Sequence, residues 1–254
     1  MELTSSAPAV GILGGGGGAG ASTVAAALAL RAGASVLTCL VDGDPWGSGV
    51  DRILGLERLP GIRWEELAQT SGRFGSQAMC GVLPREGQLT FIGWGDAGRF
   101  LPGAATVTNA LDAAREGHAA VIVDVPRAGV ILGAEAALAL VADLDRIFLV
   151  VRSSMAGLAS AARTVSAVNA ALPSVTDRMV AVVRGGGIDH LRVERTLHIP
   201  VLTTFGSERG MDEQVDLGLG PVRSHRSPVA RLTGAMWEQV GAGAGYSSDL
   251  GRAA

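Results

Sequence analysis

The sequence predicts an α/β fold in which helices cover both faces of one doubly wound, mainly parallel, seven-stranded sheet. Two observations predict this three-layered architecture. Short apolar runs alternate with longer segments of helical periodicity, which is typical of strand–helix–strand units around a buried parallel sheet. The chain also has 254 residues, of which 48% are hydrophobic, and this is enough to form one sizeable domain or two small ones.

The predicted strands are short apolar runs bounded by glycine, proline or polar residues. They are Ala9–Leu13, Ser35–Val41, Leu89–Ile92, Ala119–Val123, Arg146–Val151, Met179–Val183 and Val201–Thr204. The predicted helices place apolar residues three or four positions apart, so that one face can be buried. They are Ser22–Ala32, Trp64–Thr70, Ala104–Arg115, Leu132–Leu140, Gly157–Leu172, Ile188–Leu197, Met211–Leu217 and Pro228–Val240.

The remaining segments predict loops and chain ends. The region from Pro45 to Gln88 is long and interrupted by glycines, so we expect functional loops with short helices there. We expect residues 1–8 to be a disordered start and residues 9–240 to form one domain. The small, polar segment 241–254 is expected to be a flexible tail.

The charged residues exclude several classes of function. All 21 basic residues are arginine, and the chain contains no lysine. Chemistry that needs a lysine side chain, such as a Schiff base or the lysine of a phosphate-binding loop, is therefore excluded. The 24 acidic residues give a net charge of −3, and the arginines are scattered along the chain. This distribution argues against a nucleic-acid partner, which would require a basic face.

Cysteine usage and hydropathy indicate a cytoplasmic protein. The two cysteines, Cys39 and Cys80, fit a reduced protein better than a disulfide scaffold. The four histidines lie far apart in the sequence and lack the spacing of metal ligands. The longest mainly apolar stretch, Gly129–Ala142, is too short to span a bilayer and contains Glu135. We therefore expect no direct membrane insertion.

A glycine-rich loop follows the first predicted strand and precedes an alanine-rich predicted helix. Gly15 and Gly20 have the spacing of the two glycines in G-x-x-x-x-G-K-[ST]. Glycines allow successive N–H groups to point at one phosphate, and the following helix N-terminus adds about half a positive charge. Ser22 occupies the position of the hydroxyl that binds Mg²⁺, whereas Ala21 occupies the lysine position. A glycine-rich turn alone is a weak signal, because a flexible turn has the same composition.

Two further predicted strands are each followed directly by an aspartate. Asp42 and Asp44 follow the second strand in Val-Asp-Gly-Asp-Pro, and Asp124 stands in Ile-Val-Asp-Val-Pro. An aspartate at the carboxyl end of a strand usually faces the ligand crevice of an α/β sheet. There it can hold Mg²⁺ or its waters, or orient an attacking water. Each aspartate alone could be a helix cap or a turn residue, but motifs at three strand ends together indicate a nucleotide site.

Together these residues resemble the ParA/MinD family of deviant-Walker P-loop ATPases, in particular its CpaE/TadZ and actinobacterial septum-site-determining branch. The family's Walker A loop, K-G-G-x-G-K-[ST]-[ST], aligns with residues 16–23. Its D-x-D-P-x-G motif aligns with residues 42–47, and its apolar-D-x-P Walker B motif ends at Pro126. Cys80–Pro84 followed by Leu89–Ile92 resembles the CpaE/TadZ branch. The resemblance covers about residues 8 to 240.

The resemblance implies a domain that binds ATP or ADP with Mg²⁺, with Asp44 as the catalytic residue. The residues of the Mg²⁺ site would be Ser22, Asp44 and Asp124. The family's ATP-sandwiched dimers form partner-binding surfaces, which implies a homodimer with cell-division or pilus-assembly partners and recruitment to the septum or the pole. The nucleotide would be bound by Gly16, Gly17, Gly18, Ala19, Gly20, Ala21, Ser22 and Thr23.

The sequence departs from the family at both loop lysines. The signature lysine falls on Gly16 and the second lysine on Ala21. Loss of one such electrostatic contact typically costs on the order of 3 kcal/mol of transition-state stabilisation, so the loss of both predicts a very slow ATPase or none. Arg127 and Arg184 are candidates, on position alone, to replace the lost charges. Arg184 also stands where the family often has the asparagine that reads adenine, so the identity of the base stays open.

We therefore expect a spatial-positioning protein, for septum-site determination or a polar Tad pilus, that binds nucleotide weakly and hydrolyses it slowly or not at all. Two alternatives stay open: an active Mg²⁺-dependent ATPase rescued by an arginine, and a nucleotide-free interaction scaffold. A third alternative is a dinucleotide-dependent oxidoreductase in which Asp42 binds the ribose. This alternative does not explain the motif around Asp124. Members of the branch often carry an N-terminal receiver-like domain, so we expect the chain to be the ATPase-like domain of a longer protein.

Overall fold

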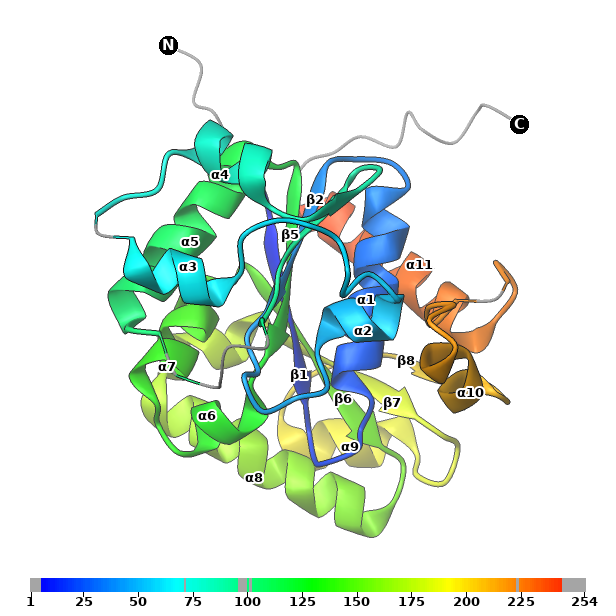
Figure 1. Ribbon diagram of the computed structural model, residues 1–254. Coiled ribbons are helices and arrows are strands. Elements are labelled where there is room, and N and C mark those ends of the chain that lie inside the picture. Colours follow the sequence, from blue (N-terminus) through cyan, green and yellow to red (C-terminus); the bar gives the residue numbers. More distant parts are fainter. Residues whose placement is uncertain (1–5, 71, 96–99, 101, 223, 244–254) are drawn as a thin grey trace.

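One mainly parallel sheet of eight strands forms the centre of the protein (Figure 1). The structure is a computed structural model and describes residues 6–243 except 71, 96–99, 101 and 223. The strands lie in the order β3-β4-β2-β5-β1-β6-β7-β8. Their bounds are β1 Ala9–Gly14, β2 Thr38–Asp42, β3 Arg85–Glu86, β4 Leu89–Ile92, β5 Ala120–Val125, β6 Arg146–Arg152, β7 Met179–Arg184 and β8 Val201–Phe205.

The predicted fold class is confirmed, but the sheet has eight strands rather than seven. The seven predicted strands correspond to β1, β2 and β4–β8. The additional strand, β3, has two exposed residues and pairs antiparallel with Leu89 and Thr90 of β4. Such a short exposed strand contains no apolar run, so it leaves no periodic signal in the sequence.

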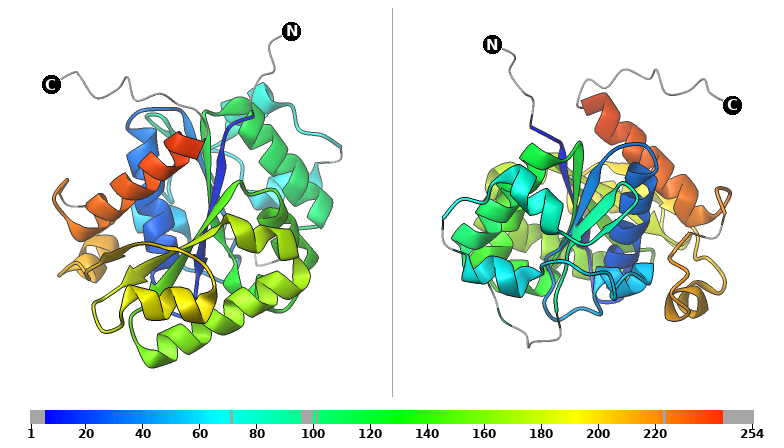
Figure 2. Two further views of the ribbon diagram at one scale, coloured as in Figure 1. Left: turned by 180° about the vertical axis from the view of Figure 1, so that it is seen from behind. Right: turned by 45° about the horizontal axis from the view of Figure 1, so that its top comes forward.

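Helices cover both faces of the sheet, which gives the predicted three layers (Figures 1 and 2). One face is covered by α1 Ala21–Gly33, α2 Val50–Leu54, α10 Met211–Asp216 and α11 Pro228–Gly243. The other face is covered by α3 Trp64–Gln69, α4 Ser76–Val82, α5 Ala104–Gly117, α6 Arg127–Ile131, α7 Glu135–Ala142, α8 Met155–Ala171 and α9 His190–Leu197. A 3₁₀ helix, Pro173–Arg178, follows α8.

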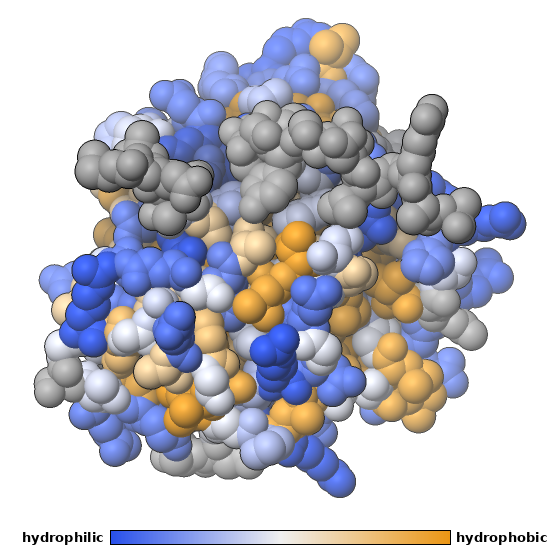
Figure 3. All heavy atoms as spheres, turned by 90° about the horizontal axis from the view of Figure 1, so that it is seen from above, coloured by the Kyte–Doolittle hydropathy of each residue, from blue (hydrophilic) through white to orange (hydrophobic). Residues whose placement is uncertain are grey.

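The strands of the sheet are buried on both faces. In β1 every residue is buried. Ala9 and Leu13 pack into the core on the side of α5 and α8, while Val10 and Ile12 pack into the core on the side of α1 and α11. Successive side chains of a strand point to opposite faces, so a continuous apolar run supplies both cores. Figure 3 shows the upper face of the molecule in Figure 1. On this face, hydrophobic residues lie in small groups among hydrophilic ones.

Several predicted boundaries differ from those observed. The predicted helix Leu132–Leu140 corresponds to α7, which begins only at Glu135 because Gly133 adopts a φ of 71° that a helix does not contain. The short helix α6, which ends at Ile131, was not predicted. α2 and α4 are short helices in the predicted loop region, 45–88. None of the described helices is long and apolar enough to cross a membrane.

The two chain ends are described only in part. Residues 1–5 of the predicted disordered start and residues 244–254 of the predicted tail lie outside the described residues. The Ala7 N–H donates to the Arg115 carbonyl (3.3 Å), and the Pro8 carbonyl accepts from the Val121 N–H (2.9 Å). At the other end, α11 continues to Gly243, three residues into the segment predicted as a tail.

Gly43, directly after β2, provides a test of how tightly the strand ends pack. Its N–H donates to the Asp124 carbonyl (3.0 Å), and a Cβ built at Gly43 would lie 2.7 Å from that oxygen and 2.8 Å from Leu140 Cδ1. We expect Gly43→Ala to lower the free energy of unfolding by about 1–3 kcal/mol, as overpacking does. Urea denaturation measures the change. Gly81→Ala is the control, because a Cβ there meets nothing within 4 Å; equal stability of the two variants would contradict the prediction.

Candidate functional site

The glycine-rich loop lies at the carboxyl end of the central strand β1, at the lower edge of the sheet in Figure 1. β1 lies between β5 and β6. The chain leaves β1 toward β2 on one side, and it later continues from β5 to β6 on the other side. This reversal of direction makes a crevice outside the strand ends, which is where open α/β sheets bind ligands.

The loop presents its backbone to this crevice. Gly18 and Gly20 adopt left-handed conformations, with φ of 66° and 95°, which glycine allows without steric cost. A Cβ built at Gly17 or Gly18 would meet nothing within 4 Å, so the outer side of the loop is open. Within α1, the Val24 N–H bonds to the Gly20 carbonyl, and the N–H groups of the first helical turn before it have no intrahelical acceptor. These groups form a cradle for an anion.

The inner side of the loop packs tightly against α8. The Gly15 N–H donates to the Val150 carbonyl (2.9 Å), and the Thr164 hydroxyl donates to the Gly15 carbonyl (3.2 Å). A Cβ at Gly15 would lie 2.9 Å from the Cβ of Ala161, and one at Gly16 would lie 2.9 Å from Ser160 Oγ. A side chain at Gly16, where the family has its signature lysine, would therefore require Ser160 to move.

Three aspartates meet beside the loop. The register of the parallel β2–β5 pair places Asp42 directly beside Asp124, and both side chains are buried. The Ser22 side chain hydrogen-bonds Asp124. Burial raises the pKa of Asp124 well above its ordinary value, and the charges of Asp42 and Asp44 raise it further. Ser22, Asp44 and Asp124, predicted from three separate motifs, therefore lie in one site.

Asp42, which the sequence grouped with Asp44 and Asp124 at the strand ends, has a further role in the structure. Its Oδ1 accepts from the Asp44 N–H and its Oδ2 from the Val50 N–H, both at 3.0 Å. The indole N–H of Trp64 donates to the Asp42 carbonyl (2.7 Å). Burial raises the pKa of Asp42 to about 7, against the lowering effect of these backbone hydrogen bonds. Asp42 therefore shapes the loop between β2 and α2.

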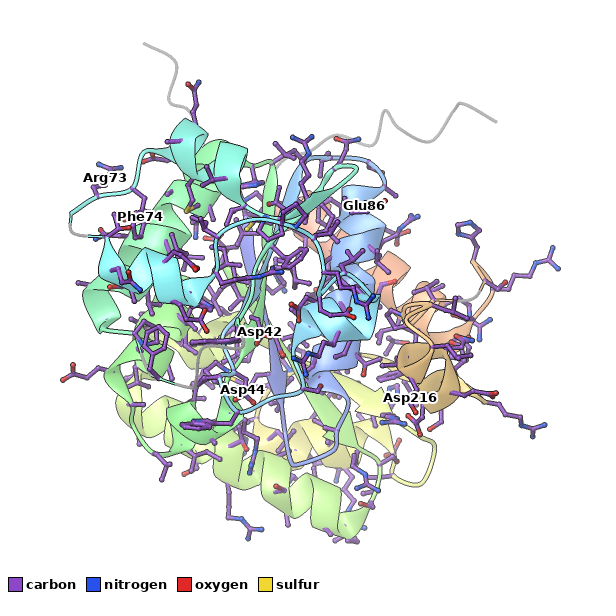
Figure 4. All side chains as sticks on the ribbon, viewed as in Figure 1. Asp42, Asp44, Arg73, Phe74, Glu86 and Asp216 are labelled. Carbon is purple, nitrogen blue, oxygen red and sulfur yellow. The ribbon has the colours of Figure 1, made fainter. Side chains whose placement is uncertain are left out.

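Asp44 lies two residues further along this loop. It is half-buried, and its Oδ1 accepts from the Trp46 N–H (3.0 Å). Figure 4 shows Asp44 a short way below Asp42, near the middle of the molecule in this view. Asp44 is thus more accessible than the other two aspartates of the site.

The donor set fits a magnesium ion that is shared with a phosphate. Across the described part of the chain, no three His, Cys, Asp or Glu residues could hold a metal by themselves. Mg²⁺ usually keeps several waters and takes only one or two carboxylates together with phosphate oxygens, so a Ser22–Asp124 pair beside an anion cradle suffices. The effects that shift the pKa of Asp124 are burial, two carboxylates and one hydroxyl. A cation would relieve this excess of negative charge.

The two candidate arginines differ in their surroundings. Arg184, half-buried at the end of β7, places its Nη1 3.5 Å from the Ala19 carbonyl of the loop. Arg127 lies behind the loop, where its Nε donates to Thr164 Oγ1 (3.0 Å) and its Nη2 to Ser160 Oγ (3.3 Å). Arg184 therefore faces the open side of the site, whereas Arg127 connects the end of β5 to α8.

Two hollows lie at this end of the sheet: one adjoins the glycine-rich loop, and the other adjoins the loop after β2. A small pocket of about 60 Å³ is lined by Gly20, Thr23, Arg184 and Glu208, among others. A larger, mostly apolar cavity of about 110 Å³ begins at Gly43 and Asp44. This second cavity is also lined by Trp46, Trp64, Trp94, Leu132 and Leu140. Sequence reasoning missed Glu208, although an acidic residue just after a strand end is a signal that could have identified it.

Comparison with known proteins gives related sequences from Mycobacterium tuberculosis and many related folds. No family model matches the chain. The chain is 35% identical over 212 residues to an uncharacterized protein of Mycobacterium tuberculosis, Rv3660c, and to its counterpart in a second strain. The match covers 82% of this chain but 57% of the relative, so the chain spans little more than half the length of the curated relatives it matches.

The similar solved structures include ParA and MinD proteins. A ParA family ATPase from Chlorobium tepidum superposes with a TM-score of 0.78 at 16% identity, over 92% of this chain and 98% of that one. MinD in the MinC:MinD complex of Aquifex aeolicus gives 0.74 at 16%, over 98% and 100%. The septum site-determining protein MinD of Pyrococcus horikoshii, complexed with Mg-ADP, gives 0.73 at 16%, over 96% and 99%. The chain therefore has the fold of the ParA and MinD ATPases.

The buried aspartates predict how stability depends on pH. An acid whose pKa is raised by folding binds more protons in the folded state, so the free energy of unfolding falls as the pH rises through the interval between the two pKa values. For Asp42 this interval runs from 3.8 to about 7. We expect Asp124→Asn to flatten this fall, because the substitution removes one buried acid and its repulsion of Asp42. Urea unfolding between pH 4 and 8 measures the slope.

The matched control is Asp177→Asn, which changes an exposed aspartate next to the start of β7. It should retain the wild-type slope. A slope that is the same in wild type and Asp124→Asn would contradict the assignment of the raised pKa to this pair.

Proposed function

We propose that the chain is a ParA/MinD-type P-loop protein that positions other proteins in the cytoplasm, binds a nucleotide weakly and hydrolyses it slowly or not at all. The observation that carries this proposal is the interaction of Ser22 with Asp124 beside a glycine-rich loop, in a chain that has no lysine. The proposed site uses backbone, hydroxyl and carboxylate groups of the glycine-rich loop and the neighbouring strand ends. The elements that need a lysine are absent.

In the proposed complex, the backbone N–H groups of residues 16–23 hold the phosphates of ATP or ADP. Ser22 and Asp124 would bind Mg²⁺, and Asp44 would accept hydrogen bonds from the water molecules of the metal ion. The metal ion, when bound, neutralises charge on the phosphate oxygens. Asp44 is the proposed catalytic residue, because its half-buried carboxylate follows the strand end and can accept a proton or a hydrogen bond from water. Asp42 keeps Asp44 in place through the Asp44 N–H.

Binding and hydrolysis depend on different parts of this site. The backbone cradle and the helix N-terminus act on the phosphates in the ground state and do not require a lysine. Phosphoryl transfer requires stabilisation of the charge that develops on the phosphate oxygens, and one lost contact typically costs about a hundredfold in rate or more. A site without its lysines is therefore better suited to binding than to turnover.

Restoring one lysine tests this proposal. We expect Ala21→Lys to raise nucleotide affinity and to raise phosphate release about tenfold or more, because it returns a charge to the first turn of α1. Ala21→Met is the matched control, since it adds a chain of similar length without charge and should leave both quantities near wild type. Gly16→Lys should do less, because its Cβ would lie 2.9 Å from Ser160 Oγ and Ser160 would have to move. Mg²⁺-dependent phosphate release and fluorescent-nucleotide titration measure the effects.

An active ATPase rescued by an arginine is the second candidate, and the position of Arg184 favours it. Its Nη1 lies within 3.5 Å of a loop carbonyl, so the guanidinium brings a positive charge to the cradle. Wild-type turnover equal to that of lysine-bearing relatives, lost in Arg184→Gln, would support this candidate and contradict slow hydrolysis. Failure to bind any nucleotide would instead support a nucleotide-free scaffold.

The positioning role is supported by the fold and by the surface beside the site. MinD of Aquifex aeolicus forms a complex with MinC, and MinD of Pyrococcus horikoshii is a septum site-determining protein. Near the loop that holds Asp44, Trp46 is 61% exposed and Leu132 is 83% exposed. We propose a homodimer that contacts cell-division or pilus-assembly partners, at the septum or at a polar Tad pilus, with this surface at the interface.

A charge at the exposed leucine tests the dimer. We expect Leu132→Glu to weaken nucleotide-dependent dimerisation about tenfold or more, because the carboxylate would lose its hydration in an apolar interface. Sedimentation velocity with and without Mg-nucleotide measures association, and nucleotide titration should give an unchanged affinity per subunit. Leu217→Glu is the control, because Leu217 is also strongly exposed (66%) but follows α10 and does not line the cavity beside Asp44. A dimer of unchanged stability in Leu132→Glu would exclude this surface.

A further inference from the structure

Arg127 joins three parts of the molecule behind the glycine-rich loop. It is the first residue of α6 and directly follows Pro126 at the end of β5. Its Nε donates to Thr164 Oγ1 (3.0 Å) and its Nη2 to Ser160 Oγ (3.3 Å), and both acceptors belong to α8. The Thr164 hydroxyl in turn donates to the Gly15 carbonyl (3.2 Å). A continuous chain of hydrogen bonds therefore runs from the end of β5 to the start of the loop.

The Thr164 hydroxyl has one proton and two carbonyl acceptors within reach. Its Oγ1 lies 3.2 Å from the Gly15 carbonyl oxygen and 3.2 Å from the Ser160 carbonyl oxygen, one turn earlier in α8. A threonine inside a helix commonly donates to the carbonyl four residues before it, and that bond alone would leave the loop without this contact. Because Thr164 is completely buried, the direction of its proton decides whether α8 holds the loop.

The guanidinium of Arg127 fixes two hydroxyls of α8 against the loop. A hydroxyl that accepts a hydrogen bond from a charged donor becomes a stronger donor itself, because successive hydrogen bonds polarise one another. A second nitrogen of the same rigid fork holds Ser160 Oγ, which lies 2.9 Å from a Cβ built at Gly16. Gly15 and Gly16 thus lie against two hydroxyls whose positions one guanidinium sets.

The direction of the N–H groups of the loop follows from how its first residues are held. The Gly15 N–H donates to the Val150 carbonyl (2.9 Å), and the Ala19 N–H donates to the Gly16 carbonyl (3.3 Å). With the bond from Thr164, these contacts fix both sides of Gly15 and the turn that follows it. In a loop without lysine, the backbone supplies the phosphate contacts, and a preorganised site binds more tightly because less ordering is required on binding.

We propose that Arg127 is a positioning residue for phosphate binding, which fixes the glycine-rich loop through Thr164 and does not contact the phosphate itself. The inference rests on the proposed function in one respect, because it takes the ligand of the loop to be a phosphate group. It adds a role for an arginine that lies behind the loop and would otherwise connect only β5 to α8.

Titration with inorganic tripolyphosphate and with fluorescent ATP, each in the presence of Mg²⁺, tests this role. We expect Arg127→Gln and Thr164→Val each to weaken binding of both probes about tenfold, as loss of a charge-assisted hydrogen bond typically does. The double variant should bind no more weakly than either single variant, because both substitutions break the same chain. Thr164→Ser removes a buried methyl group but keeps the hydroxyl, so it should retain the wild-type affinity.

The matched control is Arg146→Gln. Arg146 is also half-buried and also donates to a side chain, Gln239 Oε1 (3.1 Å), but it lies at the start of β6, at the opposite edge of the sheet from the loop. It loses the same charge and should bind both probes as wild type does. Thermal unfolding of each variant establishes that it is folded before its affinity is compared.

Each other outcome overturns a defined part of the inference. Loss of affinity in Arg127→Gln but not in Thr164→Val would show that the guanidinium acts through its charge, and additive losses in the double variant would show the same. An equal loss in Thr164→Ser and Thr164→Val would assign the effect to packing. Wild-type affinity in Arg127→Gln would overturn the inference and leave nucleotide binding intact. Failure of wild type to bind either probe would overturn the proposed function as well.

Discussion

The site depends on the register between β2 and β5, which places Asp42 directly beside Asp124. Two carboxyl groups are thereby buried next to each other at the carboxyl edge of the sheet. Burial and mutual repulsion both oppose their ionisation, and the pKa of each is raised. Such an arrangement costs folding free energy at neutral pH, and natural proteins retain such costs mainly at functional sites. A cation beside Asp124 is the simplest way to relieve it.

The absence of lysine has a structural counterpart at the loop. Gly16 lies so close to Ser160 that a Cβ could not be added without a shift. The space behind the loop is instead occupied by Arg127, whose guanidinium donates to Ser160 and Thr164. Thr164 in turn donates to the Gly15 carbonyl. The loop is therefore positioned by hydroxyl groups of α8 and by backbone hydrogen bonds, and its shape does not depend on a lysine side chain.

The sequence predicted most of the sheet and the centre of the site, for physical reasons that also explain what it missed. Buried parallel strands are continuous apolar runs, so seven of eight strands were predictable; β3 owes its conformation to pairing with β4. The Ser22–Asp124 contact follows from motifs at strand ends. The different surroundings of Arg127 and Arg184 could not be predicted in this way, because they depend on which strand ends lie beside the glycine-rich loop. That arrangement is set by the order of strands in the sheet.

Asp42 links the proposed nucleotide site to the exposed surface beside it. Its two carboxylate oxygens accept from the Asp44 and Val50 N–H groups, and Asp44 accepts from the Trp46 N–H. Ionisation strengthens these charge-assisted hydrogen bonds, and a cation at Asp124 favours ionisation of Asp42 because it offsets the repulsion between the two acids. Loading of the site would therefore tighten the loop that carries Trp46. A protein with little turnover can still report occupancy in this way, since the coupling requires binding and not hydrolysis.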